Sequence, residues 1–297
     1  MSDYYGRLAN CALRGIEFTT LKKPKGELWK VRNLVRLKAG GFEIELHQNP
    51  NLPTSLASLR GEQVITTDLF VRAVVKDEVS KVRETIDRVC ELLSFATESR
   101  VLPYYFEYPA GSGTAEARAM IGTVQMWRPP FTEAEPVKHL IDTCFQTYVD
   151  LRDRRKLNVA IEYIYNSVKE GLPSEIHIAL ACVAFENLRY NWALDSGYPH
   201  IDGFFREKGA TAGKPGHPVA LRRHLEEMFA EVGLISDVQR IVAIRNEVLH
   251  TGLYGDIRNY ETYEFLETTL REYFLRLVGY HGPFLPYCGG SPAAITI

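Results

Sequence analysis

Strand-like and helical patterns share the first half of the chain. Apolar residues recur at near-helical spacing between about Glu78 and Ser99, which predicts a helix there. Other stretches combine β-branched or aromatic residues with turn residues at their ends, which is typical of strands. They are residues 28–48, as two short strands around Ala39-Gly40-Gly41, and residues 64–75, 101–109 and 117–127. The pattern predicts an α+β fold for this half.

The second half contains little strand pattern. Apolar residues repeat there every three or four positions, and capping residues punctuate the repeats: Ser236 and Asp237 suit a helix start, Gly252 a helix end, and Pro218 a first helical turn. We expect helices at about residues 135–150, 157–170, 174–195, 218–232, 236–251 and 260–278. This half is predicted to be an all-α bundle.

The segment RPPFTEAEP, residues 128–136, is the expected boundary between the halves, because its prolines interrupt both helices and sheets. We therefore expect an α+β domain at residues 1–130, with a sensor or regulatory role, and a helical domain at residues 131–297. A glycine-rich connection at residues 196–218 separates two of the helices. It is long enough to form part of a site.

Composition favours a globular, cytoplasmic protein. Hydrophobic residues make up 45% of the 297 residues, which can support a sizeable core. The longest apolar runs are far shorter than a membrane span, and MSDYYGRL at the N-terminus lacks the apolar segment of a signal peptide, so no membrane partner is expected. The five cysteines form no CxxC pair and have no close histidine, which argues against a zinc site or a disulfide framework.

The net charge of −2 is unevenly divided along the chain. Residues 1–130 carry 18 Lys and Arg against 15 Asp and Glu, whereas residues 131–297 carry 17 against 22. Neither half is basic enough to hold nucleic acid through its overall charge. A nucleic-acid function therefore requires a local site.

One charged residue interrupts the apolar stripe of the helix predicted at residues 236–251. The apolar residues of VAIRNEVLH recur at helical spacing, and Arg245 occupies the missing position of their stripe. A buried charge costs several kcal/mol unless it is paired. Glu186, in LACVAFENLRYNW, follows a run that is apolar on every side and is equally out of place. We therefore predict an ion pair between Arg245 and Glu186 on neighbouring helices.

Asn246 and His250 share the adjoining polar face of that helix, because they are four residues apart. His250 lies in the last turn, where the partial negative charge of the helix end favours the imidazolium form. Arginine can hold and neutralise a phosphate while a nearby histidine transfers protons, so these residues suit phosphoryl chemistry on RNA. Such chemistry requires no metal and no cofactor, and none is expected.

The motif RNEVLH is an arginine, a polar residue, three further residues and a histidine near a helix end, and it resembles the signature of HEPN domains. The helix EIHIALACVAFENLRYNW, with its central glutamate, resembles in particular the C-terminal HEPN domains of ApeA-like bacterial proteins. The resemblance covers roughly residues 135–280. It implies a helical bundle that acts as a metal-independent endoribonuclease, in which the ribose 2′-hydroxyl attacks the phosphate. Many members of the family are toxins or act in antiphage defence.

The resemblance also implies roles for individual residues. Arg245 would stabilise the phosphate, His250 would act as acid or base, Asn246 would be the polar residue of the motif, and Glu186 would orient or balance Arg245. RNA is the implied substrate. A homodimer is expected, because one motif offers a single arginine and histidine whereas cleavage uses both an acid and a base. The N-terminal domain would then respond to a regulatory ligand or protein.

Two other interpretations of these residues stay open. The pair of Arg245 and Glu186 can be purely structural, with His250 only stabilising the helix end. The same helices can also form a non-catalytic HEPN-fold module that binds a partner or dimerises. His217 and His224 are expected at the surface and not as ligands.

The chain contains a second match to the arginine and histidine spacing, RLVGYH, with Arg276 and His281. With 23 arginines and 8 histidines, about one such match arises by chance, so the spacing alone decides little. The surrounding residues differ: Gly279 and the Gly282-Pro283 step interrupt a helix at the second match. Context therefore favours Arg245 and His250.

Overall fold

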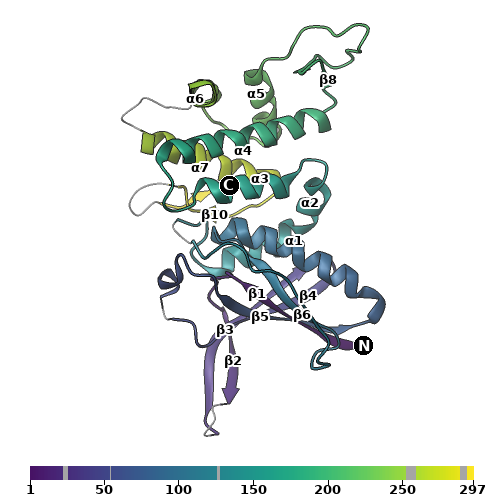
Figure 1. Cartoon of the computed structure of the whole chain (residues 1–297), viewed down its shortest axis with the longest axis vertical. Helices are drawn as coiled ribbons and strands as arrows, with labels where there is room; N and C mark the ends of the chain where they lie inside the picture. The colour runs from purple at the N-terminus through teal and green to yellow at the C-terminus, as the bar shows by residue number, and fades with distance from the viewer. Residues whose placement is uncertain (23–25, 54, 126–127, 252–258, 288–292) are drawn as a thin grey trace. The chain divides into compact units, whose positions relative to one another are not determined.

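The structure, a computed structural model, describes residues 1–22, 26–53, 55–125, 128–251, 259–287 and 293–297 (Figure 1). The chain divides into two compact units, Met1–Gln146 with Gly282–Leu285 and Thr147–His281 with Pro286–Ile297. The division falls inside helix α2 (Ala134–Arg152), so the first unit runs beyond the proline-rich segment at residues 128–136. A large sheet and several long helices confirm the α+β class.

An antiparallel sheet dominates the first unit. In the described part of the chain it has seven strands, in the order β2-β3-β4-β5-β1-β6-β7. The strands are β1 (Ser2–Ala9), β2 (Glu17–Lys22), β3 (Leu28–Ala39), β4 (Phe42–Gln48), β5 (Ile65–Val74), β6 (Leu102–Glu107) and β7 (Ala115–Ala117). Helix α1 (Val79–Thr97) packs against the sheet beside β6 (Figure 1). Its apolar side chains and the inward-facing residues of the strands form the core of this unit.

The hairpin predicted around Ala39-Gly40-Gly41 is confirmed, since β3 and β4 pair with Ala39 opposite Phe42. Gly40 and Gly41 have φ angles of +60° and +85°, which glycine adopts readily. A Cβ atom on Gly40 would also lie only 2.7 Å from Oγ1 of Thr85. The strand predicted at residues 64–75 and the helix predicted to follow it are confirmed as β5 and α1.

The strand predicted at residues 117–127 is wrong. Strand β7 ends at Ala117, and the chain beyond it passes through Gly122 with a φ angle of +80°, which breaks an extended strand. Trp127, the last residue of that prediction, lies outside the described residues. The pattern also missed β1 and β2. Strand β1 pairs with β5 and β6, so its partners are far away in the sequence and leave no local signal.

The helices of the second half follow the predictions closely. They are α2, α3 (Leu157–Ser167), α4 (Ser174–Asp195), α5 (Leu221–Glu231), α6 (Val238–Thr251) and α7 (Asn259–Leu277). Their ends agree with the predicted ones to within about three residues, the usual scatter of helix boundaries. At the start of α6, Oδ1 of Asp237 accepts a hydrogen bond from the Arg240 backbone N–H at 2.9 Å, as a capping residue does. Gly252, the expected helix end, lies outside the described residues.

Short strands make the second half less purely helical than predicted. In the glycine-rich connection, β8 (His200–Ile201) pairs with β9 (Phe204–Phe205), and α5 begins at Leu221 instead of Pro218. Two further short strands are β10 (Pro283–Phe284) and β11 (Ile295–Thr296). Among the described ranges, none of the helices is both long and apolar enough to cross a membrane.

Helix α4 is the central helix of the second unit, because it packs against α3, α5, α6 and α7. Its buried residues, among them Cys182 and Phe185, cover about half of its circumference, whereas Ile176 and Leu194 on the other side are exposed. Glu186 follows Phe185 and is itself only partly exposed, so its carboxylate needs a partner from a neighbouring element.

His224 of α5 is fully buried, so the prediction that it lies at the surface is wrong. Its ring centroid lies 4.6 Å from that of Tyr198, 5.3 Å from that of Phe205 and 5.9 Å from that of Trp192. Burial among these rings lowers the pKa of His224 to about 4. The sequence pattern missed this because Tyr198 and Phe205 come from the connection that precedes α5.

Candidate functional site

Helices α4 and α6 bring together the two charged residues that the sequence places on apolar stripes. Val238, Ile241, Ile244 and Val248 are the buried residues of α6. Arg245 lies within this stripe, four residues after Ile241 and seven after Val238, and its Nε lies 2.6 Å from Oε1 of Glu186. The predicted ion pair is therefore confirmed, although the roles assigned to its members remain predictions.

The contact between Arg245 and Glu186 is desolvated at its centre and open at its rim. Nε of Arg245 and Oε1 of Glu186 are both buried atoms. Their contact is an ion pair and not a hydrogen bond, because the N–H group does not point at the oxygen. The Arg245 side chain as a whole is 27% exposed. Its Nη1 donates to Oδ1 of Asn246 at 3.0 Å, and no described residue accepts a hydrogen bond from Nη2. Part of the guanidinium is thus available to a ligand.

Arg189 is a member of this site that sequence reasoning missed. Its Nη2 donates to Oε2 of Glu186 at 2.5 Å, and its Cζ lies 5.1 Å from the ring centroid of Phe205. The only signal in the sequence is the three-residue spacing of Glu186 and Arg189 on one helix, which is common on helix surfaces. We call Arg245, Glu186 and Arg189 the Arg245 cluster. Two guanidinium groups and one carboxylate give it a net charge of +1.

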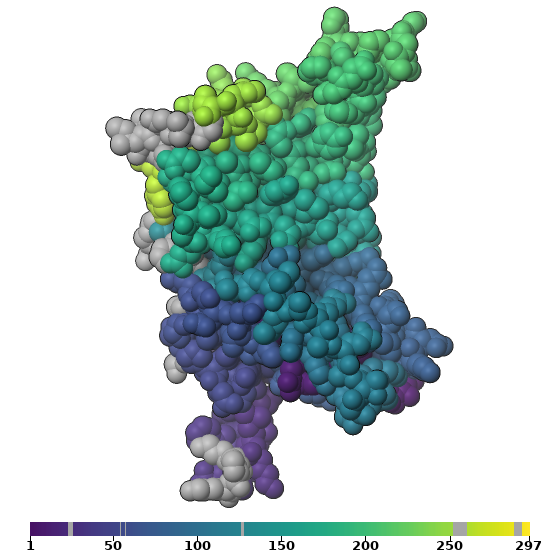
Figure 2. Space-filling view, viewed as in Figure 1, coloured from purple at the N-terminus to yellow at the C-terminus, as the bar shows by residue number. Residues whose placement is uncertain are grey.

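Asn246 and His250 are exposed on α6, and His250 lies in the last turn as predicted. The yellow-green residues of α6 reach the surface of the second unit in Figure 2. His250 lies five positions after Arg245, which corresponds to about 7.5 Å along the helix axis and about 140° around it. Arg245 faces α4 whereas His250 faces solvent, so the two side chains of one chain point in different directions.

A small apolar cleft lies beside the Arg245 cluster. It is lined by Glu186 and Arg245 together with Cys182, Phe185, Leu221, Leu225 and Ile241. Burial raises the pKa of the Cys182 thiol to about 12, against the opposing effect of the Arg245 charge. A thiol that stays protonated at neutral pH is a poor nucleophile. Cys182 therefore contributes packing and not covalent chemistry.

The second match to the motif has a different setting. Nε and Nη2 of Arg276 both lie 2.8 Å from Oε1 of Glu272, one helical turn earlier. Helix α7 ends at Leu277, and Gly279 has a φ angle of +79°. His281 therefore lies beyond the helix, as the sequence context predicts. Arg276 and His281 are matched controls for Arg245 and His250 within the same chain.

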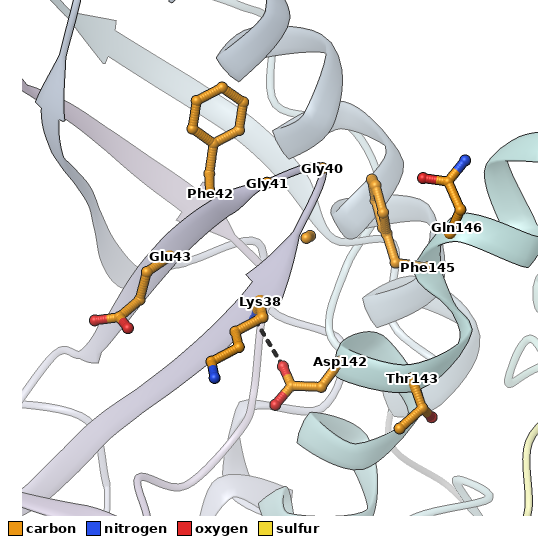
Figure 3. A pocket seen from close by; sticks show the side chains of 10 residues that line it. Lys38, Gly40, Gly41, Phe42, Glu43, Asp142, Thr143, Phe145 and Gln146 are labelled. Atoms are coloured by element: carbon orange, nitrogen blue, oxygen red, sulfur yellow. Dashed lines mark hydrogen bonds between the residues drawn. The ribbon is translucent and has the colours of Figure 1, made fainter.

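The first unit contains a cavity of about 470 Å³ (Figure 3). Strands β3 and β4, with their Gly40-Gly41 turn, line it together with α2. In Figure 3 the Asp142 carboxylate points toward Lys38, whose backbone N–H donates to Oδ1 at 2.6 Å. Lys138 donates to the other carboxylate oxygen, so the protein already satisfies this acid. The regulatory ligand of the N-terminal domain remains a prediction.

Known proteins provide no further guide to this site. No family model, no curated protein and no solved structure matches the chain. The functional interpretation therefore depends on the geometry and charge of the Arg245 cluster and on the position of His250.

Proposed function

We propose that this protein is a metal-independent endoribonuclease of the HEPN type, which cuts RNA through attack of the ribose 2′-hydroxyl on the adjacent phosphate. The observation that carries the proposal is the partly exposed Arg245, held by Glu186 and Asn246 on the helix whose last turn carries His250. An arginine with a fixed orientation and an open edge suits a phosphate, because its planar fork matches phosphate oxygens.

The proposed reaction assigns a role to each group. A base takes the proton of the 2′-hydroxyl, the oxygen attacks phosphorus, and the bond from phosphorus to O5′ breaks as an acid protonates O5′. The products are a 2′,3′-cyclic phosphate and a 5′-hydroxyl. His250 supplies acid or base catalysis, and Arg245 stabilises the charge that develops on the phosphate oxygens. Asn246 and Glu186 hold Arg245 in place.

A homodimer is part of the proposal. The reaction uses both an acid and a base, and one chain offers a single His250, which faces away from the α4 side of its own helix. A second copy of α6 would bring a second histidine to the phosphate that Arg245 holds. In this proposal the protein acts in the cytoplasm as a toxin or an antiphage ribonuclease, and the first unit restrains or triggers it.

The test compares RNA cleavage by the purified full chain in EDTA with cleavage by single variants. We expect the wild type to cut, and His250→Ala and Arg245→Ala to lose cutting by at least about 100-fold while circular dichroism shows retained folding. The matched controls His281→Ala and Arg276→Ala should cut like the wild type. Light scattering should find a dimer at micromolar concentration.

Two outcomes would overturn the proposal. Loss of cutting that is equal in the Arg245 and Arg276 variants would remove the special role of the first motif. A folded dimer that cuts no RNA, with or without extracts that supply a trigger, would favour the non-catalytic binding or dimerisation module.

A further inference from the structure

Glu186 lies between two arginines, and this geometry points to a role for the second one. We propose that Arg189 is a positioning residue of the ribonuclease site, which acts on Arg245 through Glu186. The inference rests on the proposed function and adds to it a residue that does not belong to the RNEVLH motif.

Each oxygen of Glu186 faces a different guanidinium group. Oε1 lies 2.6 Å from Nε of Arg245, and Oε2 lies 2.5 Å from Nη2 of Arg189. A carboxylate shared in this way cannot take two parallel hydrogen bonds from Arg245, which is the arrangement of an isolated arginine and carboxylate pair. Arg189 therefore fixes the orientation of Glu186 and leaves the outer edge of Arg245 open.

Arg189 gives the Arg245 cluster its excess positive charge. Without it, Glu186 and Arg245 would form a neutral pair with no excess charge to attract a phosphate. With it, the three side chains carry +1, in a place where all three are at most 27% exposed and water screens the charge only in part. A phosphate that approaches Arg245 then meets a net positive charge instead of a balanced pair.

Phe205 of β9 holds Arg189 in position. The Arg189 guanidinium lies over the Phe205 ring, and the Arg189 side chain is 16% exposed. Phe205 is itself buried, with its ring centroid 5.0 Å from that of Tyr190 and 5.3 Å from that of His224. The glycine-rich connection at residues 196–218 thus reaches the cluster through Phe205.

The experiment measures kcat/KM for RNA cleavage by the full chain in two backgrounds, wild type and Glu186→Gln. We expect Arg189→Gln to lower kcat/KM roughly tenfold or more in the wild-type background. In the Glu186→Gln background the same change should alter kcat/KM by less than about threefold, because no carboxylate remains for Arg189 to orient or offset and the site keeps an excess positive charge in either case. Arg222→Gln, which removes an exposed pair with Glu226 on α5, is the matched control and should have no effect in either background.

Binding and folding measurements complete the test. In a His250→Ala background, which keeps the RNA intact, Arg189→Gln should weaken binding of a short RNA in fluorescence anisotropy, with KM rising more than kcat falls in the cleaving enzyme. If Arg189→Gln does not fold, Arg189→Lys and Phe205→Leu replace it; both should lower kcat/KM less than Arg189→Gln is expected to, and again only when Glu186 is present.

The outcomes separate this inference from the proposed function. A wild type that cuts RNA while Arg189→Gln matches Arg222→Gln would overturn the role of Arg189 alone. An equal loss in both backgrounds would do the same, because Arg189 would then act directly on RNA or only on folding. A wild type that never cuts RNA would overturn the proposed function itself.

Discussion

Helix α4 contributes a carboxylate to each of two groups of charged residues, which differ in net charge and in the exposure of the arginine at their centre. Near its end, Asp195 accepts a hydrogen bond from Nε of Arg155 at 2.7 Å, and Nη2 of Arg155 lies 2.9 Å from Oε1 of Glu231. We call these three residues the Arg155 cluster. The Arg155 side chain is 9% exposed, against 27% for Arg245. Arg154 also pairs with Asp195, at 3.1 Å, so two arginines face two carboxylates.

The difference indicates which cluster is structural. The three residues of the Arg155 cluster carry a net charge of −1, which Arg154 balances, and the central Arg155 side chain is buried. A further anion would therefore find no excess positive charge and no access to Arg155. Burial by itself lowers the pKa of Arg155, but Asp195 and Glu231 raise it above its ordinary value, so the residue stays charged. The Arg245 cluster has one carboxylate for two arginines and an open edge. Excess charge and partial exposure, more than the presence of an ion pair, mark a candidate site.

The largest loss of stability expected from a single change is in the Arg155 cluster. Arg155→Ala leaves Asp195 without its buried partner, so we expect the free energy of unfolding to fall by about 3 kcal/mol. Denaturant titration followed by circular dichroism measures the change. Its RNA cleavage per folded molecule should equal that of the wild type, and a stable variant with impaired cleavage would reverse the assignment of the two clusters.

Glu267 of α7 differs from both clusters. Its carboxyl group is buried and forms no ion pair among the described residues. Burial raises its pKa to about 8, although a hydrogen bond from Ser167 acts in the opposite direction. The folded state therefore keeps a proton that the unfolded chain releases near pH 4.5, and this residue makes stability fall as pH rises from about 4.5 to 8. A carboxyl group without a cation is thus neutral at pH 7.

Glu267→Gln should remove this pH dependence. Relative to the wild type, the variant should gain roughly 3 to 4 kcal/mol in the free energy of unfolding between pH 5 and pH 8, as measured by thermal or urea unfolding at both pH values. Glu272→Gln, whose carboxylate pairs with Arg276, is the control and should show no such gain. An unchanged difference between pH 5 and pH 8 would mean that Glu267 is ionised in the folded protein.

The smallest expected effect on stability is that of Arg245→Ala. The lost pair is partly exposed and Glu186 keeps Arg189 as a partner, so the free energy of unfolding should fall by less than about 1 kcal/mol. The same denaturant titration tests this prediction. A loss as large as that of Arg155→Ala would place Arg245 among the structural charges and would favour the interpretation of the pair as a packing device.

Features that depend on nearby residues could be predicted from the sequence, whereas features that depend on distant residues could not. The helices of the second half follow from apolar spacing and capping residues such as Asp237, which act within a few positions. Strand β1 gave no comparable signal because its pairing residues lie in β5 and β6. Arg245 and Glu186 could be paired because each is a charge on an apolar stripe. Arg189 could not be assigned, since its role depends on Phe205 of β9.

The proposed reaction begins with the ribose 2′-hydroxyl, so a strand in which this group is blocked gives the sharpest test. A short RNA and the same sequence with 2′-O-methyl groups are incubated with the wild-type protein in EDTA, and the ends of the products are identified by mass spectrometry. We expect the RNA to be cut, with 2′,3′-cyclic phosphate and 5′-hydroxyl ends, and the 2′-O-methyl strand to stay intact because it has no 2′-hydroxyl that could attack the phosphate. Equal cutting of both strands, or cutting of neither, would contradict the proposed reaction.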